Sequence, residues 1–139
     1  MKVFLILSIF IFSVYAEEPK KNEGKEDAAR IEILLRQQRE LEADELILIA
    51  DKNKKEGNFE EAVEGYKKAI GLYSKSSASE KRIINKLNSS RISLSKTYRS
   101  LADKLIKQAE KESSVELFEQ AKRLLTEAKN TADKIKNIR

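Results

Sequence analysis

Paired carboxylates are the groups in this sequence with the most evident capacity for chemistry. Glu17 and Glu18 form one pair and Glu60 and Glu61 another, and carboxyl pairs can act as general acid and base or bind Ca²⁺. Successive residues of a helix point about 100° apart, so Glu60 and Glu61 would not converge on one substrate. No stretch offers alternating oxygen ligands around a glycine, as a calcium loop requires. Neither pair therefore predicts a catalytic or metal site.

Two residue types that carry much of site chemistry are missing. The 139-residue chain has no histidine and no cysteine, which removes the near-neutral acid–base group, thiol nucleophiles and the usual transition-metal ligands. Charged residues make up 37% of the sequence and aromatic residues 6%, with one proline and four glycines. This composition is typical of a helical protein with few turns. We expect one all-α domain that has no enzymatic activity and binds no cofactor.

The N-terminus has the pattern of a secretory signal peptide. Lys2 precedes an apolar run from Val3 to Val14, and Val14 and Ala16 are small residues ahead of a polar stretch. About a dozen apolar residues are too few for a hydrocarbon core that needs ~20. We therefore expect cleavage after residues 1–16 and export to the periplasm or cell envelope of a bacterium. An uncleaved single-pass anchor is the alternative.

The rest of the chain divides into a short leader and a helical domain. Residues 17–25 are polar and predict a flexible leader, and residues 26–139 predict the domain. Apolar residues three or four positions apart indicate a first helix that stops at Gly57, which suits a left-handed turn. Asn58 can cap a second helix that runs to about Tyr73.

The third helix is predicted to be long, from about Ser79 to Glu112. It carries two sevenfold apolar series, typical of a coiled-coil seam, which are Leu87, Leu94 and Leu101, and Ile84, Tyr98 and Leu105. Polar residues 88–91 interrupt the seam, so two shorter helices are the alternative. The first helix has a similar line at Ile31, Leu34, Gln38 and Leu41. We expect the extended parts of both helices to pack side by side as an arm.

Comparison of the chain with itself predicts an internal repeat. At a shift of 59 positions, eight of twenty-five aligned residues are identical, among them Ala50 with Ala109 and Ala62 with Ala121.

Residues 43–74 resemble a tetratricopeptide repeat, and residues 102–135 resemble it more loosely. The positions that carry the resemblance are Leu46, Ile49, Ala50, Gly57, Phe59, Ala62, Tyr66 and Ala69. In that family, small residues let two antiparallel helices approach closely and large ones fill the space between them. Glu116 departs from the corner glycine, and Ser74 from the usual final proline. The resemblance implies about two such helix pairs in a protein–protein interaction scaffold.

Partners of that family usually lie in a groove lined by the first helix of each pair. The matching positions here are Asp44, Ile47, Asp51 and Lys54 in the first copy and Asp103, Ile106, Glu110 and Ser113 in the second. Family members that bind a C-terminal carboxylate use Lys, Arg or Asn there. Because these positions are mainly acidic, the resemblance implies a basic or mixed helical segment as partner. An acidic strip that serves only solubility is the alternative.

The last predicted helix has an apolar line with no helix after it. Its members are Leu124, Ala128, Ala132, Ile135 and Ile138. We expect this flank, chiefly Leu124, Ala128 and Ile135, to bind a second copy or a larger partner. The chain should therefore form a homo-oligomer or join other envelope proteins.

Charge is unevenly distributed along the chain. Residues 17–64 hold nine Lys or Arg against fifteen Asp or Glu, and residues 80–111 hold nine against three, so neighbouring helices can pair by charge. Lysine-rich helices without interleaved aromatics predict no nucleic-acid binding. An exported scaffold is the favoured function. One alternative is the assembly module of a secretion machine, since the chain weakly resembles the N-terminal part of outer-membrane secretin subunits. Another is peripheral binding of anionic membrane or cell wall through the basic third helix.

Overall fold

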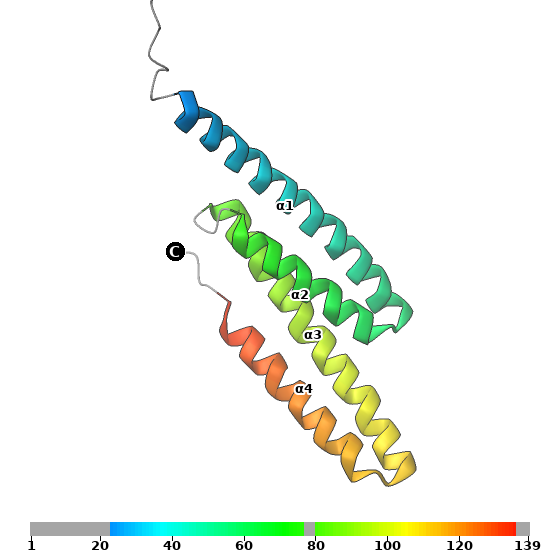
Figure 1. The fold of residues 1–139 in the computed structure, drawn as a ribbon. Coiled ribbons are helices and arrows are strands. Elements are labelled where there is room, and N and C mark those ends of the chain that lie inside the picture. The colour runs from blue at the N-terminus through cyan, green and yellow to red at the C-terminus, as the bar shows by residue number, and fades with distance from the viewer. Residues whose placement is uncertain (1–22, 77–79, 136–139) are drawn as a thin grey trace, which may run out of the picture.

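The structure is a computed structural model that describes residues 23–76 and 80–135 (Figure 1). Over these ranges it consists of α1 (Glu23–Glu56), α2 (Phe59–Lys75), α3 (Lys81–Glu112) and α4 (Val115–Asp133), with no strand. Helix α1 packs against α2, α2 against α3, and α3 against α4. The all-α prediction is confirmed for this part of the chain. The predicted signal peptide lies outside the described residues, and residues 23–25 of the predicted leader belong to α1.

The two helical corners are built alike. Gly57 and Ser113 both have left-handed backbone, with φ of 82° and 53°, and each directly follows the helix that it ends. Asn58 is the N-cap of α2 as predicted, but its side chain makes no capping hydrogen bond. Ser114 caps α4 by accepting a hydrogen bond from the Leu117 backbone nitrogen at 3.4 Å.

The corners correct the predicted alignment of the repeat. Residues 57 and 113 are 56 positions apart, whereas the identities in the sequence align at 59. Glu116 therefore does not stand at the second corner, which falls three residues earlier at Ser113. The identities reflect alanines that are buried in both halves, such as Ala62 and Ala121. Burial against any neighbouring helix selects such residues, so they do not fix the position of the turn.

Small residues do let α1 and α2 approach closely. Ala50 and Ala62 are fully buried, and a Cβ added to Gly65 would lie 2.9 Å from the Ala50 Cβ. Around this contact the core includes Tyr66 of α2 and Leu94 of α3. The residues that suggested a helix pair are thus the ones on which the pair packs.

Helix α3 is continuous, and the alternative of a break at residues 88–91 is wrong. Buried hydroxyls in this region are satisfied within or between helices. Ser90 Oγ donates to the Lys86 carbonyl at 2.8 Å, and Ser95 Oγ donates to the Ala128 carbonyl of α4 at 2.8 Å. A serine that bonds the carbonyl four residues earlier needs no interruption of the helix.

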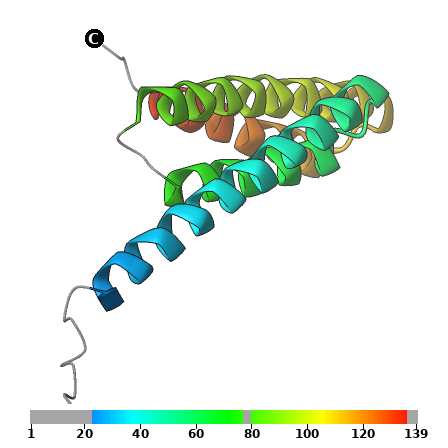
Figure 2. The ribbon, with the colours of Figure 1, turned by 90° about the horizontal axis from the view of Figure 1, so that it is seen from above.

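The predicted arm is not formed. Figure 2 shows the N-terminal part of α1 diverging from the other helices, and Ile31 and Leu34 are 57% and 63% exposed. Helix α2 ends opposite Arg39, whose guanidinium donates to the Lys75 carbonyl at 3.2 Å. The sevenfold seam of α3 packs instead against α2 and α4, where Leu94 joins the core. That packing leaves no seam free to receive α1.

Candidate functional site

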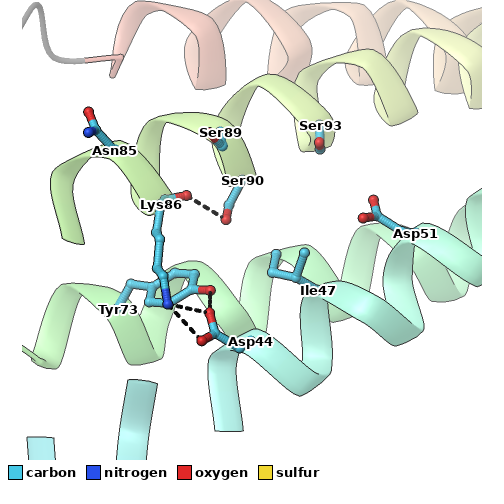
Figure 3. A pocket seen from close by; sticks show the side chains of 9 residues that line it. All are labelled: Asp44, Ile47, Asp51, Tyr73, Asn85, Lys86, Ser89, Ser90 and Ser93. Carbon is cyan, nitrogen blue, oxygen red and sulfur yellow. Dashed lines mark hydrogen bonds and ion pairs between the residues drawn. The ribbon is translucent and has the colours of Figure 1, made fainter. Parts of the chain in front are cut away.

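An open groove of about 380 Å³ lies between α1 and α3 (Figure 3). Three of the predicted partner positions, Asp44, Ile47 and Asp51, line its α1 side. Residues from α3 and α2 line the remainder, and they are Asn85, Lys86, Ser89, Ser90, Ser93 and Tyr73. The groove therefore has acidic groups on one wall and hydroxyls on the other.

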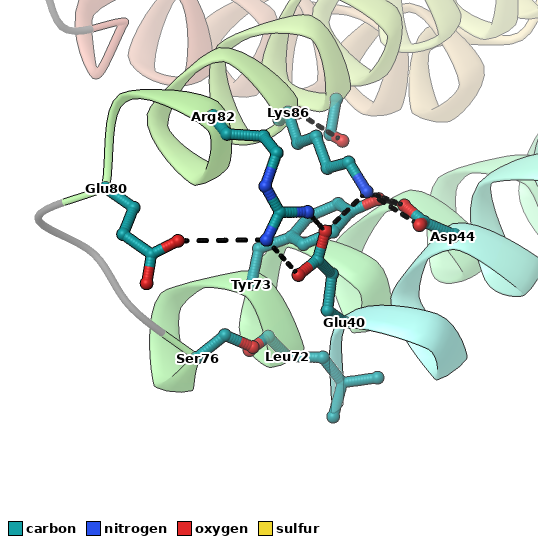
Figure 4. A network of polar contacts seen from close by, with 9 residues as sticks. Glu40, Asp44, Leu72, Tyr73, Ser76, Glu80, Arg82 and Lys86 are labelled. Carbon is teal, nitrogen blue, oxygen red and sulfur yellow. Dashed lines mark hydrogen bonds and ion pairs between the residues drawn. The ribbon is translucent and has the colours of Figure 1, made fainter. Parts of the chain in front are cut away.

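One end of the groove is closed by an ion-pair network of Glu40, Asp44, Tyr73, Arg82 and Lys86 (Figure 4). Lys86 Nζ lies 2.6 Å from Asp44 Oδ2 and 2.7 Å from Glu40 Oε1. Arg82 donates to both carboxylate oxygens of Glu40, one of them at 2.8 Å. The Tyr73 hydroxyl donates to Asp44 Oδ1 at 2.5 Å. Two carboxylates of α1 thus meet two cations of α3 across the groove.

The network keeps its members in their ordinary charge states. Burial opposes ionisation of Glu40 and Asp44, but their hydrogen bonds outweigh it and lower the pKa of both carboxyls. These bonds come from Arg82 and Lys86 to Glu40, and from Lys86 and Tyr73 to Asp44. Burial opposes the Lys86 cation too, and these carboxylates outweigh it and raise its pKa. Burial raises the pKa of Tyr73, and the hydrogen bond to Asp44 adds to the effect. Each of the two α1 carboxylates thus has a cation of α3 beside it, and Arg82 also lies 3.7 Å from Glu80, so the network ties α1 to α3.

The opposite end of the groove carries an acidic group without a cation. Asp51 forms no ion pair with any described residue, although its carboxylate accepts a hydrogen bond from the Tyr66 hydroxyl. Burial raises the pKa of Tyr66, and Asp51 raises it further, so this hydroxyl stays protonated as a donor. Asp51 is half-buried and remains accessible from the groove. It is a negative charge that a ligand can pair with.

The other predicted partner positions lie elsewhere. Lys54, Asp103, Ile106 and Glu110 do not line the groove, and Asp103 and Glu110 are exposed on α3. Asp103 follows Ser93, the last α3 residue of the lining, by ten residues, which places it about 15 Å further along the helix and beyond the groove. The second copy therefore adds nothing to this groove.

The predicted oligomer flank is largely covered within the chain. Ala128 is 1% exposed and packs with Leu94 and Tyr98, and Leu124 packs against the same core. Ile135 is half-buried just after α4. The part of this line at Leu124 and Ala128 is therefore covered by α3, because an amphipathic helix buries its apolar side against its neighbour.

Sequence reasoning missed the network residues Glu40, Tyr73, Arg82 and Lys86. The signal that pointed to them was the opposite net charge of the two segments, which predicted pairing between neighbouring helices. The structure confirms such pairing and places it at one end of the groove. Sequence alone did not show which charges meet, since that depends on the relative position of α1 and α3.

Comparisons of the chain with protein-family models, with curated proteins and with solved structures gave no match. Among residues 23–76 and 80–135 there is no cluster of acidic, histidine or cysteine side chains suited to a metal ion. No helix in the described part of the chain is long and apolar enough to cross a membrane.

Proposed function

We propose that the chain is an exported, non-catalytic protein–protein interaction module that binds a segment of another envelope protein in the groove between α1 and α3. The observation that carries the proposal is the uneven charge of the groove. Asp44 at one end is paired with Lys86, whereas Asp51 at the other end has no cation among the described residues. A lysine or arginine of the ligand would complete this pair, and a charge-assisted hydrogen bond there would fix the ligand's position.

The dimensions of the groove limit the ligand. Asp44 and Asp51 are seven residues apart on α1, about 10 Å along the helix axis. This length accommodates two turns of a helical segment or three residues of an extended one. Exposed Ser89 and half-buried Ser93 on the opposite wall offer hydroxyls to its polar groups. The ligand is therefore a short basic segment of a larger protein.

The proposal includes two tetratricopeptide-like pairs, α1 with α2 and α3 with α4. Close approach at Gly65 and Ala50 supports the first pair. The left-handed corners at Gly57 and Ser113 support the likeness of the two pairs. On this view α1 and α3 are the first helices of their pairs and jointly form the binding surface.

Binding of anionic lipid or cell-wall polymers through α3 is favoured less. Arg82 and Lys86 of α3 are engaged with α1 carboxylates, and Arg91 donates to the Lys134 carbonyl at 2.8 Å. A polyanion would have to compete with these contacts along the first half of the helix.

The proposed export depends on a signal peptide at residues 1–16, and its cleavage can be tested separately. Mass spectrometry of the protein recovered from the envelope of an expressing bacterium should give a chain that starts at Glu17. Recovery of the chain with residues 1–16 intact would contradict signal cleavage.

Ligand selection by the groove can be measured with two probe peptides. Both are alanine-based 16-residue helices, and they differ only in bearing two lysines or two glutamates one turn apart. In ¹⁵N-edited NMR titrations of the protein, the lysine peptide should shift the amides of Asp51, Ser89 and Ser93. Asp51→Asn should weaken this binding about fivefold, equivalent to ~1 kcal/mol.

The matched control is Asp103→Asn, which removes an exposed carboxylate of α3 outside the groove. It should leave the affinity for the lysine peptide unchanged. Equal shifts with both peptides, or equal weakening by both substitutions, would show that the groove does not select a basic segment through Asp51.

A further inference from the structure

Helix α1 has a second apolar side that no described helix covers. Leu34, Leu41 and Leu48 follow one another at seven-residue spacing and are 63%, 65% and 70% exposed. We call this the leucine face, and it also includes Ile31, Leu35 and Ile49, each at least 40% exposed. It extends about 27 Å along the helix. Scattered exposed leucines are ordinary, but a continuous apolar line of this length marks an interaction surface.

The leucine face lies opposite the side on which α1 packs in its own chain. Ala43 and Ala50, also seven residues apart, are fully buried. They are about 160° around the helix from Leu41 and Leu48, because two residues correspond to about 200°. Burial of the alanines against the rest of the chain therefore turns the leucines outward.

Helix α3 differs from α1 in its neighbours. The corners at Gly57 and Ser113 align α1 with α3 at a shift of 56 residues. The corners fix the order of the helices and not which sides correspond. Helix α3 packs against α2, which precedes it, as well as against α4, and Leu87 of α3 packs with Tyr73 of α2. A preceding helix is thus what α3 has and α1 lacks among the described residues.

Helix α4 has the complementary unoccupied side. Four residues of α4 at helical spacing are exposed on one side of the helix, which we call the outer face of α4. They are Phe118, Lys122, Leu125 and Lys129. Phe118 and Leu125 are each 43% exposed. This side of α4 therefore offers apolar and basic groups that no described helix covers.

The charges of the two faces match each other. Glu42 and Glu45 are exposed beside the middle of the leucine face, whereas Lys52 near its C-terminal end is paired with Glu56 at 3.9 Å. Lys122 and Lys129 are exposed beside the apolar residues of α4. Parallel pairing of α1 with a second α1 would instead bring Glu45 against its own equivalent, which is unfavourable. The acidic middle of the leucine face therefore suits the basic outer face of α4.

We propose that the chain associates head to tail, with the leucine face of one copy packed against the outer face of α4 of a second copy. Each copy then adds an α4 for the next α1, as α2 serves α3 within one chain. Such a heterologous contact produces rings or open filaments rather than a closed two-fold dimer. The surface lies outside the groove, so this inference does not depend on the ligand proposed for it.

A mixing experiment on the full chain tests this arrangement. Leu41→Glu disables the leucine face and Leu125→Glu the outer face of α4, and both sites are exposed in the single chain, so circular dichroism should show unchanged helicity. In sedimentation velocity the unchanged chain should grow beyond a dimer with concentration, and each variant alone should stay monomeric. An equimolar mixture should form a one-to-one dimer, because each variant retains the face that the other lacks.

The control is Ile92→Glu, which places the same charge at a 42% exposed isoleucine of α3 and should associate like the unchanged chain. An unchanged chain that stays monomeric up to several hundred micromolar would overturn the proposal. A closed dimer that only Leu41→Glu abolishes would show two-fold contact between α1 helices instead. An equimolar mixture of the two variants that remains monomeric would also overturn the proposal. If Leu125→Glu reduces helicity, Lys122→Glu takes its place as the variant of the outer face of α4. Mixing Lys122→Glu with Glu42→Lys should then restore association.

Discussion

The contact between α1 and α2 at Gly65 gives the sharpest test of the fold. In Gly65→Ala the new Cβ would lie 2.9 Å from the Ala50 Cβ, well inside the ~3.5–4.0 Å optimum for two carbons. Its distance of 3.5 Å from the Leu46 carbonyl oxygen is an ordinary contact. Forced overpacking costs ~1–3 kcal/mol, and replacing glycine by alanine within a helix returns ~1 kcal/mol. We therefore expect Gly65→Ala to lower the free energy of unfolding by ~0–2 kcal/mol.

Gly71→Ala is the matched control in the same helix. A Cβ at Gly71 would meet no heavy atom within 4 Å, so this change should only gain helix propensity, ~0.5–1 kcal/mol. The two variants should then differ by ~1–3 kcal/mol, or about 3–10 °C in melting temperature for a domain of this size.

Thermal and urea unfolding followed by circular dichroism at 222 nm measure the difference between these variants. Adding Ala50→Gly to Gly65→Ala removes the clashing methyl and should recover part of the loss that the contact causes. If Gly65→Ala stabilises the protein as much as Gly71→Ala does, α1 and α2 do not approach closely at this point. The basis of the helix pair would then be wrong.

Three further changes test the network and the core. Lys86→Ala removes the cation shared by two carboxylates and should cost ~1–2 kcal/mol in urea unfolding, whereas Lys96→Ala, exposed on the same helix, should stay within ~0.5 kcal/mol. The fold lowers the pKa of Asp44 from 3.8 and raises that of Lys86 from 10.5. The ion pair should therefore contribute fully to the free energy of unfolding between pH 3.8 and pH 10.5. The free energy of unfolding should fall when the pH drops through the lowered pKa of Asp44, and also when the pH rises through the raised pKa of Lys86. If the free energy of unfolding of Lys86→Ala depends on pH as steeply as that of the unchanged protein at both low and high pH, the network is not the source of this pH dependence. Ala62→Leu should overpack a fully buried site and cost ~1–3 kcal/mol, unlike exposed Glu64→Leu, and equal melting shifts would count against the packing.

Local sequence signals predicted the helices of this chain closely. The first helix was expected to stop at Gly57 and the second to begin after Asn58, and both boundaries are confirmed. These boundaries depend on the left-handed turn that glycine accommodates without strain. At the second corner Ser113 adopts the same conformation, and nothing local in its residue type signalled it.

One wall of the groove could be placed from the sequence, because the resemblance to a tetratricopeptide repeat marked Asp44, Ile47 and Asp51 as groove positions. The other wall depends on how α3 lies across α1. Lys86 reaches Asp44 from 42 residues away, a distance over which helical periodicity says nothing about rotation or register. The same uncertainty led to the expectation that Asp103 and Glu110 would share the groove.

Periodicity reports that a side of a helix is apolar, but the order of the helices decides whether that side is covered. The sevenfold lines of α1 and α3 looked equivalent in the sequence. In α3 the line packs, with Leu87 5% exposed, because α2 precedes it; in α1 the line remains open, with Leu41 65% exposed. The apolar line of α4 through Ala128 is covered by α3 for the same reason. An apolar side that stays exposed after every described neighbour has packed is thus the feature that points outside the chain, and on α1 it has the shape and charge of a site for one more helix.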